Sequence, residues 1–145
     1  MNLIDSLTGH LDPADRDRVR ARLSSNLMAW LTTVRPDGRP DTVPVWFALR
    51  PDGTIRLYTR PSKRKLRNTA ANPHVALGLD VTDIGRNVVR VTGTARLDPD
   101  AVPADEDPVY LAKYVERMAA LFDTPRSFAE QFSAALTITP DRILI

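Results

Sequence analysis

The sequence predicts a mainly β fold with inserted helices, an α+β domain that spans residues 1–145. Three observations predict this fold class. Apolar residues recur at every second position in several short segments, which is the period of a half-buried strand. The tetrapeptide Arg-Pro-Asp-Gly occurs at residues 35–38 and again at 50–53, and proline followed by Asp-Gly is strong turn chemistry. Segments with helix caps and helical spacing lie near both ends of the chain and once in its middle.

Composition limits the function classes. The chain has 145 residues, the size of one domain, and its net charge of +2 is too small for a general nucleic-acid binder. It contains no cysteine, which excludes disulfides and thiolate metal sites. The N-terminus is too short and too acidic for a signal peptide, and no apolar run reaches membrane-spanning length. We therefore expect a cytoplasmic protein without a membrane partner.

The first half of the chain predicts one helix and a β-meander. Asp12 before Pro13 is an N-cap followed by proline at the first helical position, so a helix is expected from Pro13 to about Leu23 on the surface. Residues 26–34 form a nearly continuous apolar strand, expected to be covered on both faces. One long strand fills the space between the two turns. Its inward-facing residues are Val43, Val45, Phe47 and Leu49, and Pro44 places it at a sheet edge or a bulge.

The second half predicts two more alternating strands, two helices and a last strand. The strand residues expected to face the core are Val75, Leu77, Leu79 and Val81, then Val89, Val91, Gly93, Ala95 and Leu97. The small residues Ala76 and Gly78 let a ligand, a helix or a second subunit come close. Residues 98–108 are an acidic, solvated loop without metal-ligand spacing. A core-packing helix then begins at Pro108, with apolar positions Tyr110, Leu111, Tyr114, Val115, Met118, Leu121 and Phe122. A short helix at 127–132 and a strand at 135–145 follow, so five or six strands indicate a barrel or a sandwich.

A basic segment at residues 59–73 is the candidate functional site. Ser62 is the expected helix N-cap, Asn72 and Pro73 close the helix, and the cations are Arg60, Lys63, Arg64, Lys65 and Arg67. Cations at a helix start oppose the helix dipole, each by about 0.3–1 kcal/mol, unless an anion binds there. Two of the three lysines in the chain lie here, against seventeen arginines. The alternative is an exposed basic helix start with nothing bound.

Reactive side-chain motifs are absent from the sequence. It has no nucleophile motif, zinc motif, Walker loop or GxGxxG, and His10 and His74 are too few for a metal site or a triad. An enzyme without its own reactive groups depends on a cofactor, and the anion site would then anchor that cofactor. Residues 60–67 contain no aromatic residue, which argues against nucleic-acid binding.

Several short motifs in order resemble a known family. They are Asp37-Gly-Arg-Pro, Val43-Pro-Val-Trp-Phe, Ser62-Lys-Arg-Lys-Leu-Arg-Asn, Asn72-Pro and Val91-Thr-Gly-Thr-Ala. Together they resemble the split β-barrel flavin-binding superfamily, the pyridoxamine 5′-phosphate oxidase-like fold. Within it, the chain is most similar to actinobacterial members that use the deazaflavin coenzyme F420. The resemblance covers residues 27–97 and implies a six- to seven-stranded antiparallel split β-barrel of the FMN-binding type.

The resemblance also implies a site and an activity. Lys63, Arg64 and Lys65 would grip the cofactor phosphate, with Asn68 alongside and Thr59 and Ser62 in the same segment. Val43, Pro44, Val45 and Trp46 would line the tricyclic ring, in a homodimer interface. The implied activity is hydride transfer between coenzyme F420 and a small unsaturated substrate, as an oxidoreductase. No catalytic residue is assigned, although Tyr58 or a water molecule are candidate proton sources, and no metal is expected.

Departures from the family pattern define the alternatives. The vitamin oxidases of the family carry an Arg-x-Val-Leu-Leu-Lys strand for FMN and a C-terminal extension over pyridoxal phosphate. Residues 42–47 here read Thr-Val-Pro-Val-Trp-Phe and the chain stops at Ile145, so oxidation of the vitamin is not expected. FMN is the alternative cofactor. A non-enzymatic carrier of the cofactor, or of haem or a pigment, is the alternative to an enzyme.

Overall fold

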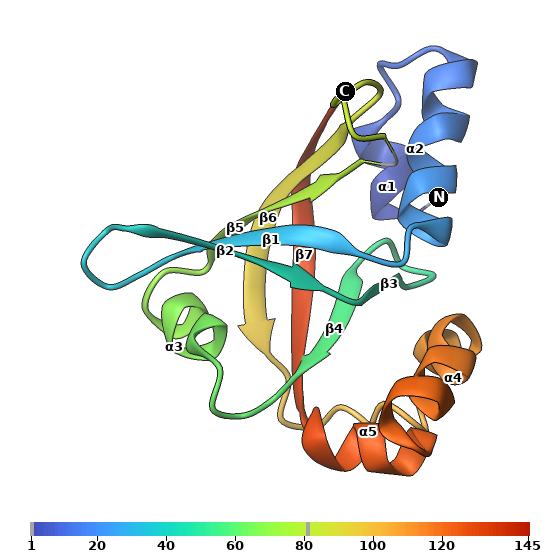
Figure 1. Ribbon diagram of the computed structural model, residues 1–145. Helices are drawn as coiled ribbons and strands as arrows, with labels where there is room; N and C mark the ends of the chain where they lie inside the picture. The colour runs from blue at the N-terminus through green and yellow to red at the C-terminus, as the bar shows by residue number, and fades with distance from the viewer. Residues whose placement is uncertain (1, 81) are drawn as a thin grey trace.

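Seven antiparallel strands and five helices make up the computed structural model, which describes residues 2–80 and 82–145 (Figure 1). The helices are α1 (Leu3–Leu7), α2 (Pro13–Ser25), α3 (Arg64–Ala71), α4 (Pro108–Phe122) and α5 (Pro125–Gln131). The strands are β1 (Ala29–Val34), β2 (Pro40–Val45), β3 (Phe47–Leu49), β4 (Ile55–Thr59), β5 (His74–Leu79), β6 (Val89–Leu97) and β7 (Ala134–Leu144). The predicted α+β class is confirmed.

The strand order closes the sheet into a split barrel. The order is β2-β1-β5-β6-β7-β4-β3, so β2 and β3 lie at opposite ends of the sheet although only Trp46 separates them in sequence. Because one residue spans at most about 3.6 Å, the two edges of the sheet must meet at Trp46. The predicted split β-barrel is therefore confirmed, and β2 is an edge strand, one of the two positions that Pro44 was expected to allow. The prediction of one long strand between the two turns is wrong, because the chain leaves one edge at Val45 and joins the other at Phe47.

Both predicted turns form. The amide of Gly38 donates to the carbonyl of Arg35 at 2.8 Å, and the amide of Gly53 donates to the carbonyl of Arg50 at 2.9 Å. Both glycines have positive φ, +88° and +91°, which a side chain would strain. The first turn sets the register of the β1–β2 hairpin, in which Thr33 lies opposite Asp41.

The barrel interior is apolar and follows the predicted alternation closely. Phe47, Leu77, Val89 and Val91 are fully or almost fully buried, and Val19 and Leu23 of α2 pack into the same core. Helix α2 therefore covers the barrel and is more than a surface helix. Leu97 was expected inside and is 49% exposed, since it is the last residue of β6. The predicted inward position of Val81 lies outside the described residues.

A second core, rich in aromatic residues, lies beneath α4 and α5. Tyr110, Tyr114 and Met118 of α4 are fully buried, while Val115 and Leu121 are 40% and 65% exposed, contrary to expectation. The buried stripe of α4 is thus narrower than its apolar pattern. The hydroxyl of Tyr114 accepts from the amide of Phe47 at 2.8 Å and lies 2.6 Å from its carbonyl, which fixes α4 to β3.

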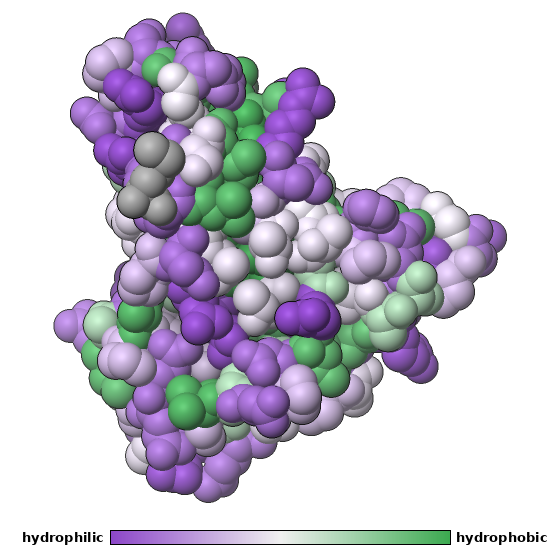
Figure 2. Space-filling model, turned by 180° about the vertical axis from the view of Figure 1, so that it is seen from behind, coloured by the Kyte–Doolittle hydropathy of each residue, from purple (hydrophilic) through white to green (hydrophobic). Residues whose placement is uncertain are grey.

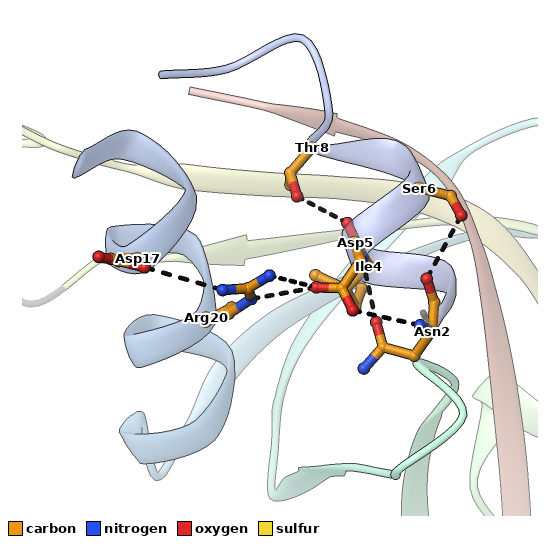
Figure 3. A network of polar contacts seen from close by, with 7 residues as sticks. All are labelled: Asn2, Ile4, Asp5, Ser6, Thr8, Asp17 and Arg20. Carbon is orange, nitrogen blue, oxygen red and sulfur yellow. Dashed lines mark hydrogen bonds and ion pairs between the residues drawn. The ribbon is translucent and has the colours of Figure 1, made fainter. Parts of the chain in front are cut away.

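The N-terminal helix α1 was not predicted. Asn2 and Asp5 form a reciprocal capping box, and Arg20 of α2 pairs with Asp5 and, at 3.7 Å, with Asp17 (Figure 3). The hydrogen bond from Arg20, followed by that from the backbone of Asn2, lowers the pKa of Asp5. These contacts tie α1 to α2, although α1 has only five residues.

Figure 2 shows the side of the molecule opposite the view of Figure 1, where most atoms are hydrophilic or weakly polar. Hydrophobic atoms form a strip in the upper part of this view and smaller patches in its lower part. Among residues 2–80 and 82–145, no helix has the length and apolar character needed to cross a membrane. Within the same residues, no group of histidines and carboxylates is placed to hold a metal ion.

Candidate functional site

A cleft of about 380 Å³ lies between the start of α3 and the β1–β2 hairpin. Its lining brings together five of the predicted site residues with three others; the lining residues are Thr33, Asp41, Val43, Ser62, Lys63, Arg64, Lys65 and Arg67. The predicted cap is wrong by one position, because the N-cap of α3 is Lys63 and makes no side-chain capping hydrogen bond. The start of α3 therefore presents uncapped N–H groups and cationic side chains to the same cleft, an arrangement suited to an anion.

Lys65 is the most constrained cation of the cleft. Its ammonium donates to the hydroxyl of Thr59, which is 3% exposed, at 2.8 Å. Burial lowers the pKa of Lys65, and the nearby charge of Lys63 lowers it further. One N–H of three is occupied by Thr59, so the others remain for a ligand. A bound anion would offset the burial penalty and the repulsion from Lys63.

Asn68 and Asp41 form a polar network behind the cations. The amide nitrogen of Asn68, a fully buried residue, donates to the hydroxyl of Thr33 at 2.9 Å and to Asp41 at 3.3 Å. Asp41 also lies 3.6 Å from Arg64 and 3.9 Å from Arg35. Asn68 does not line the cleft itself but fixes two residues that do. Its predicted position alongside the cations is consistent with this geometry.

A separate apolar pocket lies at the β2–β3 junction. It has a volume of about 230 Å³ and is lined by Pro44, Val45, Trp46, Phe122, Phe128 and Phe132. The ring of Trp46 stacks on Tyr114 and Phe128, with centroid distances of 5.2 and 5.7 Å. The four residues predicted to line the cofactor ring thus divide between two cavities, with Val43 in the cation cleft and the other three at the aromatic pocket. The segment from Val43 to Trp46 connects the two.

Tyr58 lies away from both cavities. Its hydroxyl is 2.9 Å from the carbonyl of Val102 and 3.0 Å from the carboxylate of Asp107. Burial and then the charge of Asp107 raise its pKa to about 12. A phenol held in this way is a poor proton source for a ligand in the cleft.

An exposed row of small and aromatic side chains crosses the outer face of three strands. Trp30 of β1 is 48% exposed and pairs with Pro44 of β2 on one side and Gly78 of β5 on the other. The expectation that both faces of residues 26–34 are covered is therefore not met within one chain. Strand β1 also begins three residues later than predicted, at Ala29.

Comparisons with known proteins agree with the fold. A family model described as pyridoxamine 5′-phosphate oxidase matches residues 16–145. A solved structure of an F420 reductase is 26% identical, with a TM-score of 0.66 and coverage of 86% of this chain and 94% of that chain. General Stress Protein 26 of Bacillus anthracis is 20% identical, with a TM-score of 0.64 and coverage of 88% and 89%. HupZ of Group A Streptococcus is 19% identical, with a TM-score of 0.59 and coverage of 84% and 92%.

Proposed function

Since the chain belongs to the pyridoxamine 5′-phosphate oxidase family, we propose that it is an oxidoreductase that holds the phosphate of a flavin-type cofactor in the cation cleft. The cofactor we propose is coenzyme F420, with FMN as the alternative. The observation that carries the proposal is the convergence of Lys63, Arg64, Lys65 and Arg67 on one cleft at the start of α3. Cationic side chains and uncapped helix N–H groups there stabilise the same negative charge.

The residues of the cleft fit a phosphate ester. Lys65 is held in place by Thr59 and keeps free donors, and Arg64 is half-exposed and 3.6 Å from Asp41, so it can turn toward a ligand. The similarity to an F420 reductase, at 26% identity, favours the deazaflavin. The segment Thr42-Val-Pro-Val-Trp-Phe in place of the FMN strand of the vitamin oxidases also favours it. FMN is retained as the alternative because the family binds flavin-type cofactors.

The role of this chain in the reaction would be to bind, orient and exclude water. When bound, the cofactor supplies hydride transfer to or from an unsaturated substrate. The segment from Val43 to Trp46 would orient its ring, because it connects the cation cleft with the aromatic pocket. The rings of Trp46, Phe122, Phe128 and Phe132 would hold a small planar substrate and keep water away from it.

Ligand identification tests this function. Protein purified from a host that makes both FMN and coenzyme F420 is expected to retain the deazaflavin, identified by mass spectrometry, and to quench its fluorescence on titration. Oxidation of the reduced cofactor by a panel of enones, quinones or nitroaromatics should then be accelerated. Retention of FMN instead supports the alternative cofactor. Binding without turnover of any acceptor supports a carrier, and failure to bind either cofactor contradicts the proposal.

We further infer that the protein acts as a homodimer, with the row of Trp30, Pro44 and Gly78 in the interface. The family commonly forms dimers, and a half-exposed tryptophan beside glycine and proline offers a flat apolar surface. We expect Trp30→Asp to convert the dimer into a monomer, measured by light scattering over a range of concentrations. The matched control is Leu121→Asp on α4, 65% exposed, which should leave the dimer intact. A monomeric wild-type protein would refute the inference.

A further inference from the structure

Asp41 is a carboxylate in a cleft whose other charged lining residues are cations. Of the eight described residues that line it, four are cationic and Asp41 alone is acidic. Its side chain is 19% exposed, so it faces the cleft without being free in solvent. A carboxylate beside the place where we propose that a phosphate binds should weaken binding by repulsion. The structure therefore raises the question of what Asp41 recognises.

The contacts of Asp41 leave its oxygen atoms largely unused. Among the described residues, one donor lies within hydrogen-bond distance, the amide nitrogen of Asn68 at 3.3 Å. Arg64 and Arg35, at 3.6 and 3.9 Å, are ion pairs without a short hydrogen bond. An ionised carboxylate can accept about four hydrogen bonds. Asp41 thus keeps acceptor capacity for a donor that enters the cleft.

Asn68 and Thr33 hold this carboxylate in position. Both amide protons of Asn68 are used, one on Thr33 and one on Asp41, so the orientation of the amide is fixed by its partners. Its carbonyl oxygen is buried and has no partner within the described part of the chain. Thr33 lies directly opposite Asp41 in the β1–β2 register and is 2% exposed. Because the Thr33 hydroxyl accepts from Asn68, its own proton is available to an acceptor in the cleft.

The geometry points to Asp41 as a specificity-determining residue. We propose that it accepts a hydrogen bond from a hydroxyl group on the chain adjoining the ligand's phosphate, and that it disfavours a fully deprotonated anion such as sulfate, which offers the cleft negative charge and no hydrogen-bond donor. Cations bind the phosphate group, and the carboxylate selects a phosphate ester of a polyol over a bare anion. This inference rests on the proposed function, because it concerns the same cleft, and it names the part of the ligand that the cleft distinguishes.

Two probes and one isosteric substitution test this role. The probes are sulfate and ribitol 5-phosphate, with affinities measured by calorimetry at one ionic strength. The wild-type protein should prefer the polyol phosphate by about tenfold or more, the worth of one charge-assisted hydrogen bond. In Asp41→Asn, sulfate should bind several-fold tighter because the repulsion is gone. The preference for ribitol 5-phosphate should fall by roughly tenfold.

Controls separate this inference from the proposed function. Asp17→Asn makes the same change on α2, where Asp17 is 78% exposed, and should alter neither affinity. Asp41→Ser replaces Asp41→Asn if the latter does not fold. Equal tightening of both probes in the Asp41 variant would overturn the selective role and leave the anion site standing. Failure of the wild-type protein to bind ribitol 5-phosphate would overturn the role of Asp41, and failure to bind coenzyme F420 and FMN as well would overturn the proposed function. Binding of coenzyme F420 with the probe preference unchanged in Asp41→Asn would overturn only the role of Asp41.

Discussion

Lys65→Glu is expected to lower the affinity for the cofactor by at least roughly 100-fold. The substitution removes a charge-assisted contact to the phosphate, worth about 1.5–3 kcal/mol, and places a negative charge beside it, which adds about 1–4 kcal/mol of repulsion. Lys65 is expected to be more sensitive than its neighbours because its ammonium is hydrogen-bonded to buried Thr59 and the residue is only partly exposed. Quenching of deazaflavin fluorescence on titration measures the effect.

The matched control for Lys65→Glu is Arg39→Glu. Arg39 lies in the β1–β2 hairpin with a 75% exposed side chain, and the substitution changes the net charge by the same amount. We expect at most a small loss of affinity there, which falls further with added salt because exposed charges are screened. Thermal unfolding of both variants excludes global unfolding as the cause. Unchanged affinity in Lys65→Glu would mean that the phosphate binds elsewhere.

The cations of the cleft could be predicted from the sequence because they are adjacent in the chain. The residues that reach the cleft through strand pairing could not. Lys63, Arg64 and Lys65 are adjacent in the chain, and their misfit with the helix dipole is visible without a structure. Thr33 and Asp41 belong to a different element and reach the cleft only because the hairpin register sets them opposite each other. Counting outward from the Arg35–Gly38 turn would have paired them, but not placed them against α3.

The division of the chain at Trp46 could not be predicted from strand alternation. Val43, Val45, Phe47 and Leu49 keep one inward period across the break, so the pattern is that of a single strand. The break depends on the closure of the whole sheet, which no local window contains. For the same reason, the sequence did not reveal that Trp46 packs among the rings of α4 and α5. The exposure of Val115 and Leu121 likewise depends on which side of α4 packs against the rest of the chain.

The largest expected effect on stability is at Gly93 in β6. The register between β6 and β7 shifts at Thr92 and Gly93, and a Cβ at position 93 would lie 2.3 Å from the carbonyl oxygen of Thr139. That oxygen is backbone in a paired strand, so it cannot move away without breaking the bulge. We expect Gly93→Ala to lower the free energy of unfolding by about 2–4 kcal/mol, which corresponds to a fall of roughly 5–15 °C in the unfolding temperature.

Gly78→Ala is the matched control for Gly93→Ala, since both glycines lie within strands. A Cβ at position 78 would meet no atom within 4 Å. Both substitutions belong in the Trp30→Asp background, where the inferred dimer contacts of Gly78 do not contribute, and urea unfolding gives the free energies. We expect Gly78→Ala to change the free energy of unfolding by less than about 1 kcal/mol. Equal costs at the two positions would mean that the β6–β7 bulge tolerates a side chain at position 93 and that the close approach of Thr139 does not require glycine there.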